Sequence, residues 1–369
     1  MTATIALPAV SMLLWCCGLY LLWRIPLCSG KRDDAASEGC TIIIPARDEE
    51  HNLPRLLQSL RGQCTPDDEI LVVNDHSTDR TADAARGNGA TVVESAARPG
   101  GWTGKTWACW QGAQTARNDL LLFIDADTWF ATGALDRMLA TRRQAGGMLS
   151  VQPFHCMRKP YERLSILFNI MVMIGVDAFS PHAGRRPPSG SFGPCVLCTR
   201  KEYFAAGGHR AVRDSVLENL ALGPLFRRAG STIACYGGRD TLCYRMYPGG
   251  IGELIEGWTK GFATGAAHTP PLTMALTILW IAGAFISSIA AVLSFVSSAT
   301  AVPVAAVLGY SLYCGQLYWM ARRIGNFGPV TCLLLPVHLL FFTLIYARSF
   351  IAIFIRKKVR WKGRTVSIG

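Results

Sequence analysis

The hydrophobic positions of the chain form long apolar runs near both ends and shorter, interrupted runs between them. A helix needs about 20 mostly apolar residues to cross a bilayer. The long runs have or approach that length and cover residues 5–23, 272–297, 301–320 and 329–355. They predict an N-terminal transmembrane anchor within 1–27 and a C-terminal transmembrane region within 271–355.

The first run could also belong to a signal peptide, which has a basic start and a small-residue cleavage site. Residues 1–23 contain no Lys or Arg, so a retained anchor is favoured, with its N-terminus outside. Basic residues gather on the cytoplasmic side of membranes. Arg24, Lys31 and Arg32 therefore predict a multi-pass protein of the cell membrane whose middle segment, residues 31–270, is cytoplasmic.

The last apolar run determines the side of the basic tail, residues 356–369. A single crossing by 329–355 would place this tail outside, against its charge. Pro336 interrupts the run, so a re-entrant or interfacial hairpin is the alternative. We expect a cytoplasmic tail.

The middle segment alternates between short apolar runs and stretches with helical spacing. Strands are predicted over 41–45, 69–75, 91–93 and 119–124, and helices over 52–60, from 77–79 onward, and over 105–115. This alternation predicts an α/β fold in three layers, with a mostly parallel sheet. The apolar stretch 164–179 includes Asn169 and Asp177, which favours a buried or interfacial helix over a membrane span.

Composition narrows the class of protein. Half of the residues are hydrophobic and the mean hydropathy is +0.25, which argues against disorder and against a purely soluble enzyme. The net charge of +12 suits anionic lipid, because basic residues flank the apolar runs; nucleic-acid binding would explain none of the acidic clusters described next. The 13 cysteines are scattered and predicted to be reduced, and the lone Cys195-x-x-Cys198 pair is a weak zinc signal.

Polar clusters follow three of the predicted strands, at 46–49, 74–77 and 125–127. Ligands gather at the carboxyl ends of parallel strands, so these clusters are expected in one cleft. Asp125 and Asp127 suit Mg²⁺ or Mn²⁺ bridging a diphosphate, although two capping aspartates are the simpler alternative. Residues 101–106 resemble a phosphate-binding P-loop, but Pro99 stands where its first glycine belongs. Lys105, at a helix start, can still contact phosphate.

These motifs together carry a resemblance. The segments 41–50, 72–79, 104–105 and 123–127, in this order, resemble the nucleotide-sugar half of family 2 glycosyltransferases, which have a GT-A fold with a Rossmann-like mixed sheet. The later segments 189–193 and 207–209 resemble acceptor-side loops of membrane-bound members. Segments 245–248 and 256–262 resemble the 4,4′-diaponeurosporenoate glycosyltransferases of carotenoid biosynthesis.

The resemblance implies roles for individual residues. The nucleotide-sugar site would comprise Pro45, Ala46, Glu49, Asp75, Lys105 and Asp125, and the metal site Asp125 and Asp127. The acceptor side would comprise Gly190, Ser191, His209, Trp258 and Lys260. Trp258 and Lys260 are equally consistent with interfacial anchors of the membrane region.

The catalytic base departs from the family pattern. Family members present a Glu-Asp pair whose aspartate is the base, whereas this chain has Glu218-Asn219. Either Glu218 is the base, or the acceptor is a carboxylic acid, which is already ionised near neutral pH.

The resemblance implies an inverting transferase that moves a hexose, glucose first, from a UDP-sugar to a lipid-soluble acceptor. A carotenoid acid is the first candidate, and a hopanoid, a diacylglycerol or a polyprenyl phosphate are alternatives. A non-catalytic scaffold with the same fold is the alternative of a different class. The Gln-x-x-Arg-Trp motif of polymer synthases is absent, and the basic loop 182–188 is expected to gate the acceptor or to touch lipid headgroups.

Overall fold

The computed structural model describes residues 2–32, 38–215, 218–294, 301–355, 358–361 and 364–367. The chain divides into two compact units. The sheet unit comprises residues 26–156 and 187–245, and the helical unit comprises 1–25, 157–186 and 246–369. The predicted soluble domain, residues 31–270, is therefore distributed over both units.

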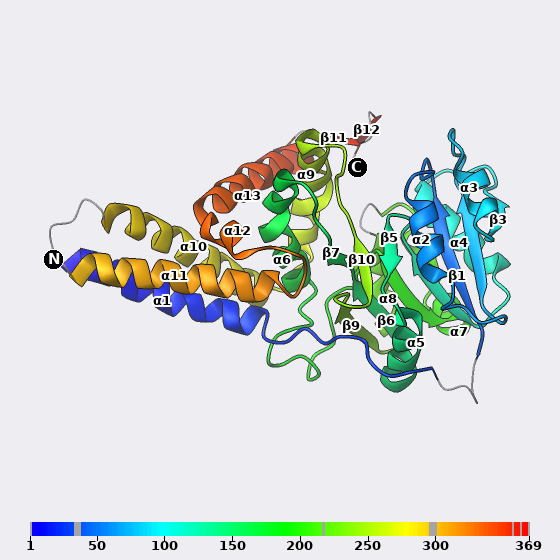
Figure 1. The fold of residues 1–369 in the computed structure, drawn as a ribbon, viewed down its shortest axis with the longest axis horizontal. Helices are drawn as coiled ribbons and strands as arrows, with labels where there is room; N and C mark the ends of the chain where they lie inside the picture. The colour runs from blue at the N-terminus through cyan, green and yellow to red at the C-terminus, as the bar shows by residue number, and fades with distance from the viewer. Residues whose placement is uncertain are drawn as a thin grey trace. The chain divides into compact units, whose positions relative to one another are not determined.

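The sheet unit is built on a seven-stranded mixed sheet with the order β3-β2-β1-β4-β8-β6-β9 (Figure 1). Its strands are β1 (Cys40–Ala46), β2 (Glu69–Asn74), β3 (Thr91–Glu94), β4 (Leu120–Ile124), β6 (Met148–Gln152), β8 (Cys195–Thr199) and β9 (Ile233–Gly237). All neighbours pair in parallel except β8, which is antiparallel to both β4 and β6. The predicted α/β class and mixed sheet are confirmed. A second, three-stranded sheet contains β5 (Thr128–Phe130), β7 (Phe154–His155) and β10 (Leu242–Tyr244).

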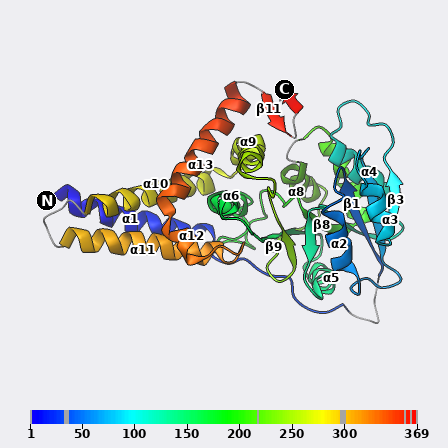
Figure 2. The same cartoon turned by 45° about the horizontal axis from the view of Figure 1, so that its top comes forward.

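The helical unit contains three long helices that lie side by side, α1 (Thr2–Leu21), α10 (Pro271–Ser294) and α11 (Ala301–Ala321) (Figures 1 and 2). Its other elements are η2 (Pro160–Ser165), α6 (Ile166–Gly175), α9 (Ile251–Ala267), α12 (Pro329–Leu333), α13 (Leu335–Phe350), the π-helical turn η4 (Ile351–Ile355), β11 (Lys358–Trp361) and β12 (Arg364–Ser367). Helix α6 is largely buried, as predicted for 164–179.

The membrane prediction is supported for one helix. Among the described residues, α10 is the one helix long and apolar enough to cross a membrane. Two shorter apolar helical segments cover 9–21 and 335–350. The predicted N-terminal anchor and the multi-pass arrangement stay predictions.

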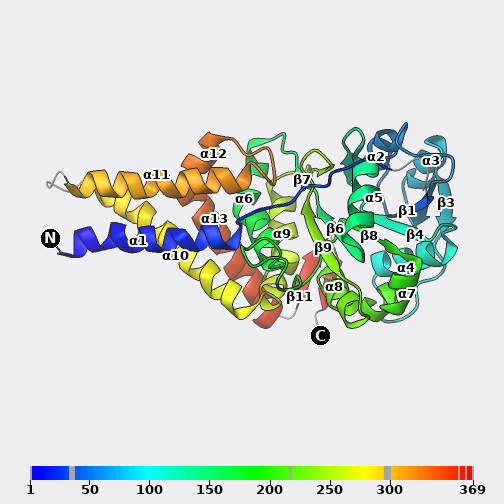
Figure 3. The ribbon, with the colours of Figure 1, turned by 90° about the horizontal axis from the view of Figure 1, so that it is seen from below.

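Helices cover both faces of the seven-stranded sheet (Figure 3). One face packs against α2 (Leu53–Leu60), α3 (Thr81–Gly87) and α5 (Ala134–Ala145), and the other against α4 (Gly104–Thr115), α7 (Arg200–Ala205), η3 (Gly208–Val212) and α8 (Glu218–Arg228). Strands β1, β2 and β4 are runs of Ile, Leu and Val because both of their faces are buried. The three predicted layers are thus present, and they leave the strand ends as the place for polar side chains.

The helix predicted from 77–79 onward begins later, at Thr81. Thr78 and Ser77 are held in the preceding loop, because the Thr78 backbone N–H donates to the Asp48 carboxylate over 2.7 Å and the Asp48 N–H donates to Ser77 Oγ over 3.1 Å. These residues therefore join two loops instead of starting a helix.

Candidate active site

The ends of β1, β2 and β4 lie next to one another because these strands are parallel neighbours. Asp75 follows β2, and its N–H donates to the carbonyl of Ala46, the last residue of β1, over 2.8 Å. A Cβ at Gly104 would overlap the Asp75 carboxylate, so any larger residue there would displace the Asp75 side chain. Gly104 thereby brings the N-terminal end of α4 against Asp75, and the predicted clustering of Ala46, Asp75 and Lys105 follows from this close approach.

Hydrogen bonds connect the loops after β1 and β2, and each loop contains a residue with an unusual backbone conformation. Asp48 and His76 both adopt left-handed φ values, 55° and 53°, which non-glycine residues rarely do. Glu49 donates its N–H to Thr81 Oγ1 over 2.8 Å, and its carboxylate accepts from Asn52 over 2.7 Å. Glu49 is thus held in the loop after β1, while Pro45 lies within β1 and pairs with Val73 of β2.

Four ionisable residues, which we call the charged cluster, meet at the end of β4: Lys105, Asp125, Asp127 and Glu218. Lys105 Nζ lies 2.7 Å from Asp125 Oδ1 and 3.2 Å from Glu218 Oε1. The Glu218 side chain is 10% exposed, whereas those of Lys105 and Asp125 are 34% and 26% exposed. Burial alone would lower the pKa of Lys105, but Asp125 and Glu218 outweigh it and raise that pKa. Lys105 therefore stays charged and holds Glu218 to the strand end.

Three carboxylates face this single lysine, and the pKa values of two of them, Asp125 and Asp127, are raised. Burial, then Asp125 and Glu49, raise the pKa of Asp127 to about 7. Burial also raises the pKa of Asp125, although Lys105 opposes the rise. Two neighbouring carboxylates repel each other when both are ionised. A divalent cation bound between them would stabilise their ionised forms.

The aspartate pair fits the coordination habits of Mg²⁺ and Mn²⁺. Among the described residues, no group of three or more His, Cys, Asp or Glu side chains is arranged to hold a metal ion. Mg²⁺ typically takes only one or two carboxylates and completes its shell with water and substrate phosphates. Asp125 and Asp127 match that pattern.

Comparisons with known proteins agree with this geometry. The sequence profile described as "Glycosyl transferase family 2" matches residues 41–220. The 4,4'-diaponeurosporenoate glycosyltransferase of Staphylococcus aureus (strain USA300) is 35% identical over 356 residues, covering 95% of this chain and 94% of that enzyme. The chain belongs to glycosyltransferase family 2.

The fold of this family 2 glycosyltransferase also has a solved counterpart. The mannosyltransferase PcManGT from Pyrobaculum calidifontis, solved with GDP-Man and Mn²⁺, has a TM-score of 0.55 at 16% identity and covers 92% of this chain and 99% of that one. The GT-A fold is thereby confirmed. Family membership makes the chain an enzyme of the glycosyltransferase class and sets the scaffold alternative aside.

The predicted acceptor-side residues of the sheet unit lie beneath its surface. Ser191 and His209 are 1% and 2% exposed, and a Cβ at Gly190 would press on Leu220. His209 Nδ1 and the Tyr203 hydroxyl are 2.9 Å apart, and burial lowers the pKa of His209 to about 4. These residues are thus part of the packed interior of the sheet unit, and their contact with an acceptor stays a prediction.

Trp258 belongs to the helical unit. Its ring is 7% exposed, stacks on Phe168 at 4.8 Å and donates from Nε1 to Ser165 Oγ over 3.0 Å. These contacts give Trp258 a structural role, and its predicted contact with a sugar or with lipid stays a prediction. The side chains of Lys260 and Asn219 lie outside the described residues.

Sequence reasoning missed three side chains near the strand ends. Arg47 Nη1 lies 3.7 Å from Asp75 Oδ2. Tyr244 is buried, accepts a hydrogen bond from Gln152 over 3.1 Å, and has its pKa raised by burial and also by Asp127. The third, Arg213, is tied to the start of α4 through its carbonyl. Arg47 and Tyr244 lie in or next to recognised motifs, whereas nothing in the sequence singles out Arg213.

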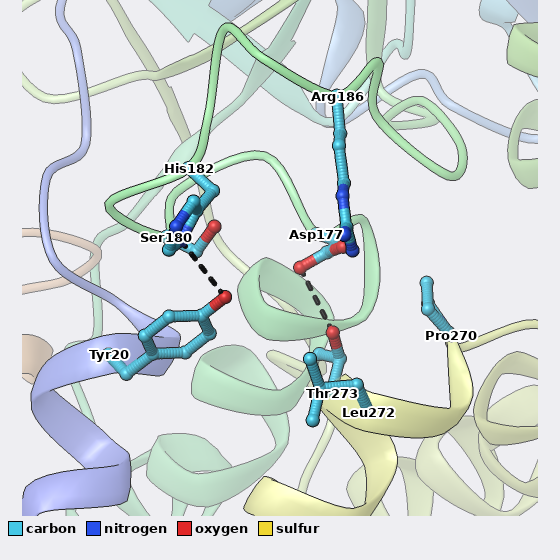
Figure 4. A pocket seen from close by; sticks show the side chains of 8 residues that line it. All are labelled: Tyr20, Asp177, Ser180, His182, Arg186, Pro270, Leu272 and Thr273. Atoms are coloured by element: carbon cyan, nitrogen blue, oxygen red, sulfur yellow. Dashed lines mark hydrogen bonds between the residues drawn. The ribbon is translucent and has the colours of Figure 1, made fainter.

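The basic loop 182–188 contributes to a small pocket of the helical unit (Figure 4). Tyr20 Oη and His182 Nδ1 are 3.2 Å apart on one side, and Thr273 donates to Asp177 over 3.0 Å on the other. Arg186 reaches in from the loop (Figure 4). The cavity volume of about 30 Å³ gives room for about two waters, and the predicted role of the loop in gating an acceptor or touching lipid stays a prediction.

Proposed function

We propose that this glycosyltransferase transfers a hexose, glucose first, from a UDP-sugar to a lipid-soluble carboxylic acid at the cytoplasmic face of the cell membrane. The observation that carries the proposal is the charged cluster, in which Lys105 pairs with Glu218 and Asp125. Next to Glu218, Asn219 stands where the family has the aspartate that acts as the catalytic base. The name of the Staphylococcus aureus relative, a diaponeurosporenoate glycosyltransferase, denotes a carboxylate acceptor. A carotenoid acid is accordingly the first candidate.

The residues at the carboxyl ends of the strands would bind the nucleotide-sugar donor. Pro45, Ala46, Glu49 and Asp75 would hold the nucleoside, and Lys105 would approach the diphosphate. Asp125 and Asp127 would hold Mg²⁺ or Mn²⁺, which stabilises the charge of the departing diphosphate when bound. The raised pKa of Asp127 supports this assignment, because a cation would relieve the repulsion that causes part of it.

The reaction would be a single displacement. An acceptor carboxylate oxygen attacks the anomeric carbon from the face opposite the UDP, so the new ester bond forms as the bond to the phosphate oxygen breaks, with inversion. A carboxylate has no proton to lose near neutral pH, so no base is needed. Asn219 is neutral and would not repel the approaching anion as an aspartate would.

A second candidate has one observation in its favour. Glu218 is a carboxylate directly before the family's base position, and it could deprotonate an alcohol such as that of a hopanoid or a diacylglycerol. A polyprenyl phosphate is already an anion, so, like a carboxylic acid, it would need no general base. The bond to the sugar differs among these products: it is an acetal with an alcohol, part of a phosphodiester with a polyprenyl phosphate, and an ester with a carboxylic acid. Mild alkali cleaves the sugar from the carboxylic acid most readily.

The test measures UDP release by detergent-solubilised protein from UDP-glucose with Mg²⁺ or Mn²⁺, with and without a membrane-lipid extract. We expect release that the extract stimulates and that Asp127→Ala abolishes. Asp83→Ala, which removes an exposed aspartate of α3, is the matched control and should leave release unchanged. A glycosylated acid in the extract from which mild alkali releases the hexose would support the first candidate, whereas a product whose hexose stays bound to its alcohol after mild alkali, identified by mass spectrometry, would support an alcohol acceptor.

A further inference from the structure

Three tryptophans of the sheet unit, Trp102, Trp107 and Trp110, surround the start of α4, the end of the helix that carries Lys105. All three rings are partly exposed. Trp102 meets Trp107 edge to face at 4.9 Å and lies 6.2 Å from Trp110. Large aromatic rings left in contact with water beside a reaction site are typical of binding surfaces.

The three rings differ in what holds them. Trp110 packs against Phe204 at 5.4 Å and Tyr203 at 6.1 Å, so it belongs to the core beneath α4. Trp107 is fixed by a hydrogen bond from its Nε1 to the Ala96 carbonyl over 3.0 Å. Trp102 packs against these two rings from the loop before the helix, so it belongs to one partly exposed aromatic cluster with them.

Arg213 is fixed next to this cluster. Its carbonyl accepts hydrogen bonds from the Thr103 N–H and from Thr106 Oγ1, each over 2.8 Å. A Cβ at Gly101 would lie 4.0 Å from Arg213 Nε, so the guanidinium runs beside the residue that precedes Trp102. Arg213 is exposed. A cation and an apolar ring therefore both lie at the start of α4, the end of the helix that carries Lys105.

We propose that Trp102 and Arg213 bind the acceptor, with the Trp102 ring against its apolar chain and the Arg213 guanidinium on its carboxylate. An extended amphiphile with an acidic head fits this pair because a guanidinium recognises a carboxylate through two parallel hydrogen bonds and an indole offers a large apolar face. The inference rests on the proposed function and deepens it, because it assigns acceptor selection to two residues outside the nucleotide-sugar motifs.

The experiment separates chain recognition from head-group recognition with three probes. Retinoic acid has both a polyene chain and a carboxylate, retinol has the same chain with an alcohol head, and sorbic acid is a short, water-soluble acid. Binding to the full-length, detergent-solubilised protein is measured by equilibrium dialysis, a readout that does not depend on Trp102, and transfer from UDP-glucose is followed in parallel. The variants are Trp102→Ala, Trp102→Phe, Arg213→Gln and Arg213→Lys.

We expect Trp102→Ala to weaken binding of retinoic acid and of retinol about tenfold and Trp102→Phe to restore most of it, with sorbic acid unaffected. Arg213→Gln should weaken retinoic acid about tenfold and leave retinol unchanged, and Arg213→Lys should recover part of the loss. The Kd for UDP should stay constant in all four variants. Arg210→Gln, an exposed arginine of η3, and Trp23→Ala, an exposed tryptophan of the helical unit, are the matched controls.

The two proposals can fail separately. Equal losses for retinoic acid and retinol in Arg213→Gln, or unchanged retinoic acid binding in Trp102→Ala, would overturn the inference even if the wild type makes glycosyl esters. Wild-type binding of retinoic acid with the expected variant pattern, but with sugar transferred only to alcohols, would overturn the proposed acceptor and leave the binding pair standing. No measurable binding of retinoic acid by the wild type would overturn the inference directly.

Discussion

The two units surround their partly or fully buried polar side chains differently. In the helical unit, two buried tryptophans each donate to one neutral partner of the same unit, Trp258 to Ser165 over 3.0 Å and Trp280 to Gln316 over 2.7 Å. In the charged cluster of the sheet unit, one lysine faces three carboxylates, and burial together with the neighbouring Asp125 and Glu49 raises the pKa of Asp127 to about 7. A balanced pair serves packing, whereas an unbalanced, partly exposed cluster leaves interaction energy for a ligand.

The largest expected effect follows from removing Asp127. Asp127→Ala should lower metal-dependent UDP release at least about 10³-fold, because a bound cation contributes several kcal/mol of charge stabilisation in the transition state. Initial rates of UDP release over a series of Mn²⁺ concentrations check this, with UDP binding without metal as the control for folding. Retained metal-dependent turnover would show that the imbalance in the charged cluster serves another purpose.

Glu218 and Asn219 sharpen the comparison within the cluster itself. If the acceptor is a carboxylic acid, Glu218→Gln should keep transfer to acids, and Asn219→Asp should raise transfer to alcohols about 10²-fold by restoring a general base. Competition between matched acid and alcohol acceptors measures both. Complete loss of transfer to acids in Glu218→Gln would make Glu218 the base and contradict the proposed division of roles.

The sequence allowed the strand ends to be predicted but not the support beneath them. The motifs around Asp75 and Asp125 follow apolar runs of strand length, so periodicity located them and parallel pairing brought them together. The pairing of Lys105 with Glu218 joins residues more than a hundred positions apart, and no local pattern encodes such a contact. Strand β8, which lies between β4 and β6 and is antiparallel to both, is as apolar as the parallel strands of the sheet, so its direction could not be predicted from its sequence.

His209 provides a pH test of a buried polar pair in the sheet unit. Its pKa is about 4 in the folded protein and about 6.5 when unfolded, so the folded state disfavours the proton. The contribution of His209 to the free energy of unfolding is therefore fully present above pH 6.5. It declines as the pH falls from 6.5 towards 4, by about 2 kcal/mol at pH 5. His209→Gln should flatten this decline in thermal unfolding midpoints measured between pH 7.5 and 4.5. An equally steep decline in the variant would assign it to other groups.

The smallest expected effect concerns Trp258 and distinguishes its two interpretations. Trp258→Phe keeps a ring against Phe168 but removes the donor to Ser165, whose hydroxyl is fully buried. A buried acceptor left without its donor costs about 1–2 kcal/mol, which should lower the unfolding midpoint by about 1–3 °C while kcat and the acceptor KM stay unchanged. Trp280→Phe, which leaves Gln316 without its donor, is the matched control in the same unit and should behave alike. A raised acceptor KM with an unchanged midpoint would instead show that Trp258 contacts the substrate, and the contrast between balanced packing and unbalanced chemistry would then no longer follow the boundary between the two units.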